Sequence, residues 1–199
     1  MRIGLFFGTF NPIHVGHLII ANYMAHNTDL EQVWLVVTPH NPHKDKSTLL
    51  ADHHRYYMCQ LAIEDNPKLR VSNIEFKLPQ PSYTVVTLAE LRHQYPQHQF
   101  ILIMGEDNLM TLHKWKNPKE ILTHHQIYVY PRKGIESFER EFKLDESIKS
   151  YQHRIKMFNL PLIHLSASFI RKCIRENKNV RYLIPDKIYN YIKEMHFYE

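Results

Sequence analysis

Residues 2–17 read RIGLFFGTFNPIHVGH, and two changes of pattern within them indicate the fold. The apolar run Arg2–Phe7 predicts a buried β-strand. Gly8 and Thr9 follow as a tight turn, and from Val15 onward the apolar residues have the spacing of an α-helix. A strand that passes through a short loop into a helix is typical of a βαβ unit, so this stretch predicts a parallel sheet.

The rest of the sequence continues the alternation of strands and helices. We expect further strands at residues 33–38, 71–76, 100–104, 127–130 and 162–165. We expect helices at residues 15–26, 52–64, 84–94, 108–115, 118–124, 168–176 and 186–194. This order predicts an α/β fold: a single Rossmann-like, doubly wound parallel sheet with helices on both faces. Residues 1–199 are expected to form one domain, with the helical segment at about 166–199 packed on the sheet.

Composition excludes several classes of protein. The chain has 199 residues, of which 44% are hydrophobic and 23% charged, which excludes a disordered chain, collagen and a coiled coil. No apolar run approaches the roughly 18 residues that a membrane span needs. The first residues have the pattern of a strand rather than of a signal peptide. The two cysteines, Cys59 and Cys173, are too few for a disulfide framework, so we expect a cytoplasmic protein.

Charge is consistent with a phosphate-bearing ligand. The 25 Lys and Arg exceed the 20 Asp and Glu, giving a formal net charge of +5. The basic residues are spread along the chain and form no run typical of a nucleic-acid tail. The chain also holds 15 histidines, an unusual number.

Two of these histidines, His14 and His17, lie where the first helix is expected to begin. At this spacing they share one face, and the positive end of the helix dipole favours an anion there. Gly8 and Gly16 leave room for a ligand near the backbone. This arrangement predicts a phosphate clamp. Zinc ligation is less favoured because no third ligand is evident nearby, and a purely capping or core role is the structural alternative.

Residues 8–17, GTFNPIHVGH, resemble the G-[ST]-F-[DN]-P-x-H-x-G-H signature of the nucleotidylyltransferase superfamily. The resemblance implies that both histidines contact the phosphates of ATP and stabilise the transition state at the α-phosphorus. It also implies that three other residues belong to the ATP site: Gly8, Thr9 and Phe10. Phe7 precedes this signature where many members carry a second glycine.

A second anion-binding pattern occurs at residues 166–171, SASFIR. Free N–H groups at a helix start, two hydroxyls and an arginine favour an anion, whereas an ordinary N-cap by Ser166 or Ser168 is the structural alternative. The segment resembles the I-S-S-T-x-I-R motif of the same superfamily, with Ala167 in place of the middle serine. The resemblance implies ATP contacts, with the β- and γ-phosphates held here, by four residues: Ser166, Ser168, Phe169 and Arg171.

Further segments resemble the nicotinate mononucleotide adenylyltransferase family in particular. Residues 39–44 are similar to its P-x-x-P-H-K loop, residues 81–88 to P-S-Y-T-x-D-T-L, and residues 105–115 to G-x-D-x-L…L-x-x-W. Residues 182–192 are similar to its closing motif, Y-L-[IV]-P-x-x-V-x-x-Y-I. The resemblance implies that ATP is also bound by Gly105 and Asp107. It implies that nicotinate mononucleotide is bound by Lys44, Tyr83, Thr84, Trp115 and Arg132.

The resemblance implies adenylyl transfer from ATP to nicotinate mononucleotide, with four catalytic residues: His14, His17, Lys44 and Arg171. Pyrophosphate leaves, and no covalent enzyme intermediate is expected. Mg²⁺ is expected to arrive on the oxygens of ATP and pyrophosphate, without a metal site built by the protein. The expected partners are these small molecules, with no nucleic acid and no membrane, and a homo-oligomer is left open.

Other readings stay open. A pantetheine-phosphate adenylyltransferase shares the first and last phosphate motifs, but such proteins are typically shorter and lack the Ser-Tyr-Thr and Leu-x-x-Trp segments. An enzyme that prefers nicotinamide mononucleotide is the closer alternative, because Val86 stands where the family usually has Asp. Length disfavours a cytidylyltransferase. A non-catalytic nucleotide- or RNA-binding module is disfavoured by the retained phosphate ligands.

Overall fold

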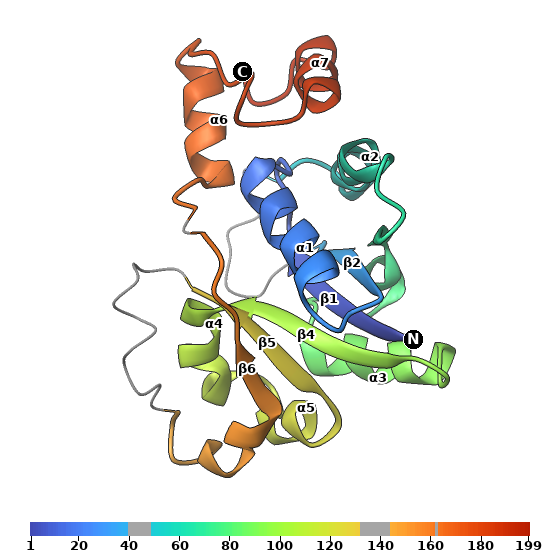
Figure 1. The fold of residues 1–199 in the computed structure, drawn as a ribbon. Helices are drawn as coiled ribbons and strands as arrows, with labels where there is room; N and C mark the ends of the chain where they lie inside the picture. The colour runs from blue at the N-terminus through green and yellow to red at the C-terminus, as the bar shows by residue number, and fades with distance from the viewer. Residues whose placement is uncertain (40–48, 132–143, 162) are drawn as a thin grey trace.

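The computed structural model describes residues 1–39, 49–131, 144–161 and 163–199. Its centre is a six-stranded sheet with the strand order β3-β2-β1-β4-β5-β6, in which every neighbouring pair is parallel (Figure 1). The strands are β1 (Arg2–Gly8), β2 (Gln32–Val37), β3 (Leu69–Ser72), β4 (Gln99–Gly105), β5 (Gln126–Tyr130) and β6 (Ile155–Met157). The predicted doubly wound parallel sheet is therefore confirmed.

Strand β1 lies in the middle of the sheet because its residues are apolar on both faces. Leu5 pairs with Trp34 of β2 on one side and with Leu102 of β4 on the other. From β1 the chain first adds strands on one side and then crosses to the other, so strand order reverses between β1 and β4. Ligands of such sheets bind at the carboxyl ends of the strands beside this reversal.

Helices cover both faces of the sheet (Figure 1). The helices whose buried residues share a core with Phe6 of β1 are α1 (Val15–Asn27), α2 (Asp52–Ile63), α6 (Ala167–Arg175) and α7 (Asp186–Glu194). Those that share the opposite core with Ile3 and Leu5 are α3 (Thr84–Gln94), α4 (Glu106–Thr111) and α5 (Pro118–His124). Burial on both faces explains why the strands are continuous apolar runs.

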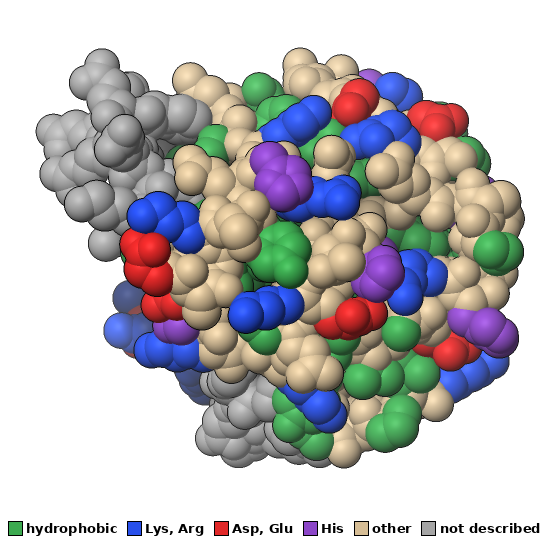
Figure 2. All heavy atoms as spheres, turned by 90° about the horizontal axis from the view of Figure 1, so that it is seen from below, with side chains coloured by type: hydrophobic (Ala, Val, Ile, Leu, Met, Phe, Trp, Pro, Cys, Tyr) green, Lys and Arg blue, Asp and Glu red, His purple; other side chains and the backbone are tan. Residues whose placement is uncertain are grey.

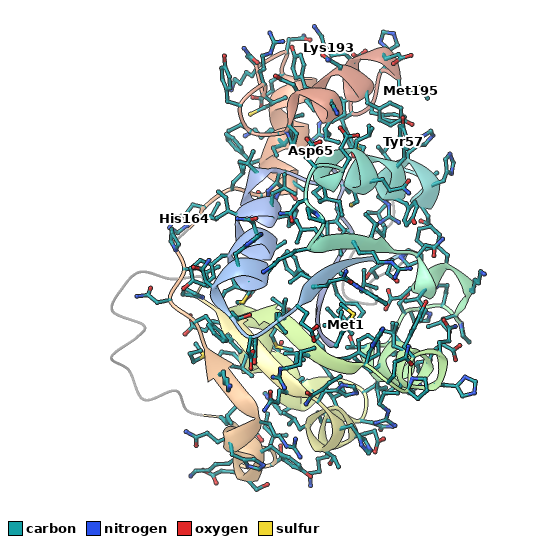
Figure 3. The ribbon with its side chains drawn as sticks, turned by 45° about the vertical axis from the view of Figure 1, so that its right-hand side comes forward. Met1, Tyr57, Asp65, His164, Lys193 and Met195 are labelled. Carbon is teal, nitrogen blue, oxygen red and sulfur yellow. The ribbon has the colours of Figure 1, made fainter. Side chains whose placement is uncertain are left out.

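The last helix, α7, packs beside α2. Ile188 and Ile192 of α7 are buried in the same core as α1 and α2, and an ion pair joins Lys187 to Glu64 at the end of α2. In Figure 3 the labelled Lys193 and Met195 lie close to Tyr57 and Asp65 of the α2 region.

Three expectations about local structure were wrong in part. Residues 163–165 form no strand; the last strand is β6, which pairs with β5 as an edge strand. The predicted strand at 71–76 ends at Ser72 and gives way to a 3₁₀ helix, Ile74–Lys77. The helix predicted at 108–115 divides into α4 and a 3₁₀ helix, Leu112–Lys114.

A further 3₁₀ helix, Lys149–Arg154, lies just before β6. On the face drawn in Figure 2, Lys and Arg side chains are interspersed with Asp, Glu and His side chains. None of the helices in the described ranges has the length and apolar character needed to cross a bilayer.

Candidate active site

The loop after β1 folds Phe10 back beneath the candidate site. A Cβ atom on Gly8 would lie 2.8 Å from the ring of Phe10, so this close approach requires glycine. Phe10 has a positive φ of 45° and is 1% exposed, and its ring packs edge-on against that of His17 with centroids 5.1 Å apart. Because this ring is buried, a contact between Phe10 and ATP would have to come from its backbone.

The two histidines of the loop are brought together as their spacing predicts. His14 is the N-cap residue of α1, and its ring stacks on that of His17 with centroids 3.7 Å apart. The backbone N–H of His14 donates to Nδ1 of His17 at 3.3 Å. A neutral His17 that accepts through Nδ1 carries its proton on Nε2, which makes Nε2 a hydrogen-bond donor.

Gly16 has no side chain, so both the ring of His14 and the segment around Ile163 can pack closely against the start of α1. A Cβ atom at this position would lie 3.0 Å from Nδ1 of His14 and 3.0 Å from Cγ2 of Ile163. The segment that leads into α6 therefore passes directly beside the helix start that carries the histidines.

Helix α6 brings the second anion-binding motif to the first loop. Ser166 is the N-cap, and its Oγ accepts a hydrogen bond from the N–H of Phe169 at 3.2 Å. Nη1 of Arg171 donates to the carbonyl oxygen of Asn11 at 2.7 Å, and Nη2 donates to Oγ of Ser168 at 3.4 Å. Partial burial lowers the pKa of Arg171, but a guanidinium stays charged at neutral pH. The two motifs thus meet, although Ser166 also has the capping role that was its structural alternative.

The closing motif, residues 182–192, contacts the start of α1 through a backbone hydrogen bond. The N–H of Val15, the first residue of α1, donates to the carbonyl oxygen of Leu183 at 3.1 Å. This hydrogen bond satisfies one of the N–H groups that a helix start leaves without an intrahelical partner.

Other predicted residues lie at the end of the neighbouring strand. Gly105 is the last residue of β4 and the N-cap of α4, and Asp107 is exposed in the first turn of that helix. Both positions are at the carboxyl edge of the sheet beside β1, where the predicted ATP site would require them.

The residues predicted to contact nicotinate mononucleotide are brought together only in part. Tyr83 is the N-cap of α3 and Thr84 its first residue, and Nζ of Lys116 lies 4.4 Å from the centroid of the Tyr83 ring. The residue that contacts Tyr83 is thus Lys116, the sequence neighbour of Trp115. Trp115 itself is partly buried and packs against the core beneath α3 and α5. Two predicted residues, Lys44 and Arg132, lie outside the described residues.

Arg55 is a residue of the site that sequence reasoning missed. Its side chain is fully buried, and its guanidinium donates to the carbonyl oxygens of Thr9 at 2.5 Å, Thr38 at 2.9 Å and Leu50 at 2.9 Å. Nη2 donates to the carbonyl oxygen of Pro39 at 3.4 Å and pairs with Asp52 at 2.5 Å. One cation thus joins the loops after β1 and β2 to the start of α2. The only sequence signal was the helical spacing of Asp52 and Arg55.

Glu75 was also missed. It is 1% exposed, and its carboxylate accepts a hydrogen bond from the hydroxyl of Thr87 on α3 at 2.6 Å. Burial raises the pKa of this carboxyl group. The hydrogen bond ties the 3₁₀ helix Ile74–Lys77 to α3, whose first residues are the predicted Tyr83 and Thr84.

Comparison with known proteins agrees with this geometry. A family model described as "Cytidylyltransferase-like" matches residues 5–173. The chain is 55% identical over 199 residues to a "Probable nicotinate-nucleotide adenylyltransferase" of Flavobacterium psychrophilum, covering 100% of both chains. A relative with the same description from Caldicellulosiruptor saccharolyticus is 37% identical and covers 96% of each chain.

The chain belongs to the nicotinate-nucleotide adenylyltransferase family.

The solved structures that this family member resembles include one titled Plasmodium falciparum nicotinic acid mononucleotide adenylyltransferase complexed with NaAD. The TM-score is 0.77 at 19% identity, with 99% of this chain and 97% of that chain covered. At such identity the likeness concerns the fold, and it extends over the whole adenylyltransferase chain, including α6 and α7.

Replacing Arg55 by methionine should destabilise the protein strongly. Arg55→Met removes the donor of four carbonyl oxygens in the loops after β1 and β2, and of the carboxylate of Asp52. Each buried acceptor left without its donor typically costs about 1–3 kcal/mol, so the free energy of unfolding should fall by more than about 3 kcal/mol. Urea-induced unfolding should show a loss of this size.

The control is Arg181→Met, which also removes a guanidinium from a pair with an aspartate, Asp186, but at a side chain 51% exposed. Exposed pairs contribute at most about 1 kcal/mol. Similar losses in the two variants would show that the buried contacts of Arg55 are not specially stabilising.

Proposed function

We propose that the protein transfers the adenylyl group of ATP to nicotinate mononucleotide, giving deamido-NAD and pyrophosphate, a step of NAD biosynthesis. The observation that carries this proposal is the hydrogen bond between Arg171 and Asn11, which brings two phosphate-binding motifs to one strand end. The aromatic Tyr83, at the start of α3, and Trp115, at the end of the 3₁₀ helix after α4, would supply surfaces for a pyridine ring. The relatives that define the family bear the name of this activity.

In this reaction the 5′-phosphate of the mononucleotide attacks the α-phosphorus of ATP in line, and pyrophosphate leaves. The attacking oxygen is already an anion, so the enzyme needs no general base. Catalysis then consists of positioning the two substrates and stabilising the charge that develops on the phosphoryl oxygens. We assign this stabilisation to the stacked His14 and His17 and to Arg171, whose guanidinium bonds the loop that leads to them, and we add Lys44 on the resemblance.

The remaining contacts divide between the two substrates. We assign to ATP the loop after β1, the start of α4 and the start of α6, namely Gly8, Thr9, Phe10, Gly105, Asp107, Ser166, Ser168 and Phe169. We assign to nicotinate mononucleotide the start of α3 and the end of the 3₁₀ helix after α4, namely Tyr83, Thr84 and Trp115, together with Lys44 and Arg132.

We also propose that Mg²⁺ enters as the complex of ATP. The phosphate oxygens of the nucleotide are the hard ligands that Mg²⁺ prefers, and the ion commonly keeps water in its remaining positions. Within the described ranges, no three His, Cys, Asp or Glu side chains are grouped so that they could hold a metal ion.

A cytoplasmic location fits the cysteines. Cys59 and Cys173 are both buried and free, and burial raises the pKa of the Cys59 thiol. Buried thiols with a raised pKa are unreactive and need no oxidising environment.

A pyrophosphate-release assay tests the acceptor. With ATP present, we expect release with nicotinate mononucleotide to exceed release with nicotinamide mononucleotide and with phosphopantetheine. Equal or greater release with nicotinamide mononucleotide would favour the alternative suggested by Val86. Release with phosphopantetheine alone would overturn the proposed substrate, and release with none would favour a binding module.

Replacing His17 by alanine should lower kcat by about 10²–10³, which corresponds to roughly 3–4 kcal/mol for the loss of one donor to the transition state. His93→Ala, which removes an exposed histidine from α3, serves as the control and should leave kcat unchanged. A wild-type kcat in the His17 variant would contradict the role assigned to this side chain.

Replacing Trp115 by alanine should raise the KM for the mononucleotide by about tenfold, the effect of losing about 1.4 kcal/mol of stacking. The KM for ATP should change little, and Trp115→Phe should retain most of the affinity because it keeps an aromatic ring. An equal rise in both KM values would indicate that Trp115 serves only as core packing.

A further inference from the structure

The segment after α7, residues 195–199, turns back toward the candidate active site. His196 and Tyr198 have positive φ values of 53° and 68°, a region that residues other than glycine occupy at a cost in free energy. The backbone N–H of Phe197 donates to the carbonyl oxygen of Ile192 at 3.0 Å, which holds the turn against α7. Strained residues persist where surrounding contacts impose them, and these contacts can be identified.

Phe197 anchors the turn on the helices. Its ring lies 4.8 Å from that of His54 on α2 and 5.7 Å from that of Tyr191 on α7, measured between centroids. These aromatic contacts place the next residue, Tyr198, over the start of α2 and the first loop.

Tyr198 then reaches Asn11. Its hydroxyl donates to Oδ1 of Asn11 at 2.7 Å, and the same oxygen accepts a hydrogen bond from the N–H of Leu50 at 3.3 Å. Burial raises the pKa of Tyr198, although the nearby Arg171 opposes the rise, so the phenol stays protonated at neutral pH and acts as a donor.

Asn11 links this contact to the proposed catalytic groups. It is 2% exposed, and its own carbonyl oxygen accepts from Nη1 of Arg171. It also lies three residues before His14, the N-cap of α1. The position of residue 11 therefore sets both the orientation of the guanidinium and the entry of the chain into the helix that carries His14 and His17.

We propose that Tyr198 is a positioning residue for adenylyl transfer, which acts by holding Asn11 so that Arg171 and the histidine pair face the triphosphate together. The proposal rests on the proposed function and adds to it a residue 187 positions away from Asn11 in sequence. Small misplacements of catalytic groups lower the rate of the chemical step more than they weaken binding.

The test compares two tyrosine-to-phenylalanine variants. Tyr198→Phe removes the hydroxyl on Asn11. Tyr191→Phe removes a hydroxyl that bonds Nδ1 of His54 at 2.8 Å within the same aromatic cluster but does not contact Asn11. Each variant loses one hydrogen bond, so both melting temperatures should fall by a similar small amount.

Of the two tyrosine variants, only Tyr198→Phe should lose activity. We expect its kcat to fall about tenfold while both KM values stay within about twofold, and we expect wild-type kcat in Tyr191→Phe. Asn11→Ala should lower kcat as well, and adding Tyr198→Phe to it should cause no further loss, because the two side chains act through one contact. A wild-type kcat in Tyr198→Phe, or an equal loss in both tyrosine variants, would overturn the proposal.

A second measurement does not depend on the acceptor. Hydrogen–deuterium exchange of the backbone amides in residues 9–14 should be faster in Tyr198→Phe than in the wild type and in Tyr191→Phe. If the wild type shows no transfer to nicotinate mononucleotide, the proposed function fails, and the exchange rates still decide whether Tyr198 holds the loop. Unchanged exchange would contradict the contact on which the proposal is based.

Discussion

The guanidinium of Arg55 is the interaction on which the candidate site most depends. A buried cation is tolerated only where its donors are satisfied, and here four backbone carbonyls and a carboxylate satisfy them. These acceptors come from the ends of β1 and β2 and from the residues before α2. The loops that bear the proposed ATP contacts are thereby held to the sheet by a side chain that takes no part in the chemistry.

The doubly wound sheet could be predicted because its signal is repeated along the chain. Long apolar strands such as β1 and β4, separated by helices such as α3, are compatible with few folds other than a doubly wound sheet. Short elements were less predictable. Strand β6 has three residues, too few to show a pattern, and it is recognised by its pairing with β5. The 3₁₀ helix at Ile74–Lys77 carries Glu75, whose hydrogen bond to Thr87 on α3 joins residues twelve positions apart.

The residues of the candidate site also differ in whether the sequence alone could identify them. Its histidines, its serines and Arg171 could be singled out because they lie within continuous motifs. That the two motifs meet did not follow from the topology, because residues 163–165 lead into α6 without forming the expected strand. Arg55, Glu75 and Tyr198 could not be found, because each acts through partners that are distant in sequence. Nothing in the residues around Tyr198 indicates that its hydroxyl bonds Asn11, and a single charged residue within a helix or strand pattern does not reveal its burial.

The hydrogen bond from Val15 to the carbonyl of Leu183 has a consequence for the order in which the site is built. β1 is synthesised first, but its neighbour β4 begins only at Gln99, and the partners of the first loop, Arg171 and Leu183, come later still. During synthesis on the ribosome, the early loop therefore has its sequence motif but not its binding partners. Such non-local contacts form late in folding. A nascent chain should gain its affinity for nucleotide in one late step, when the last two helices dock.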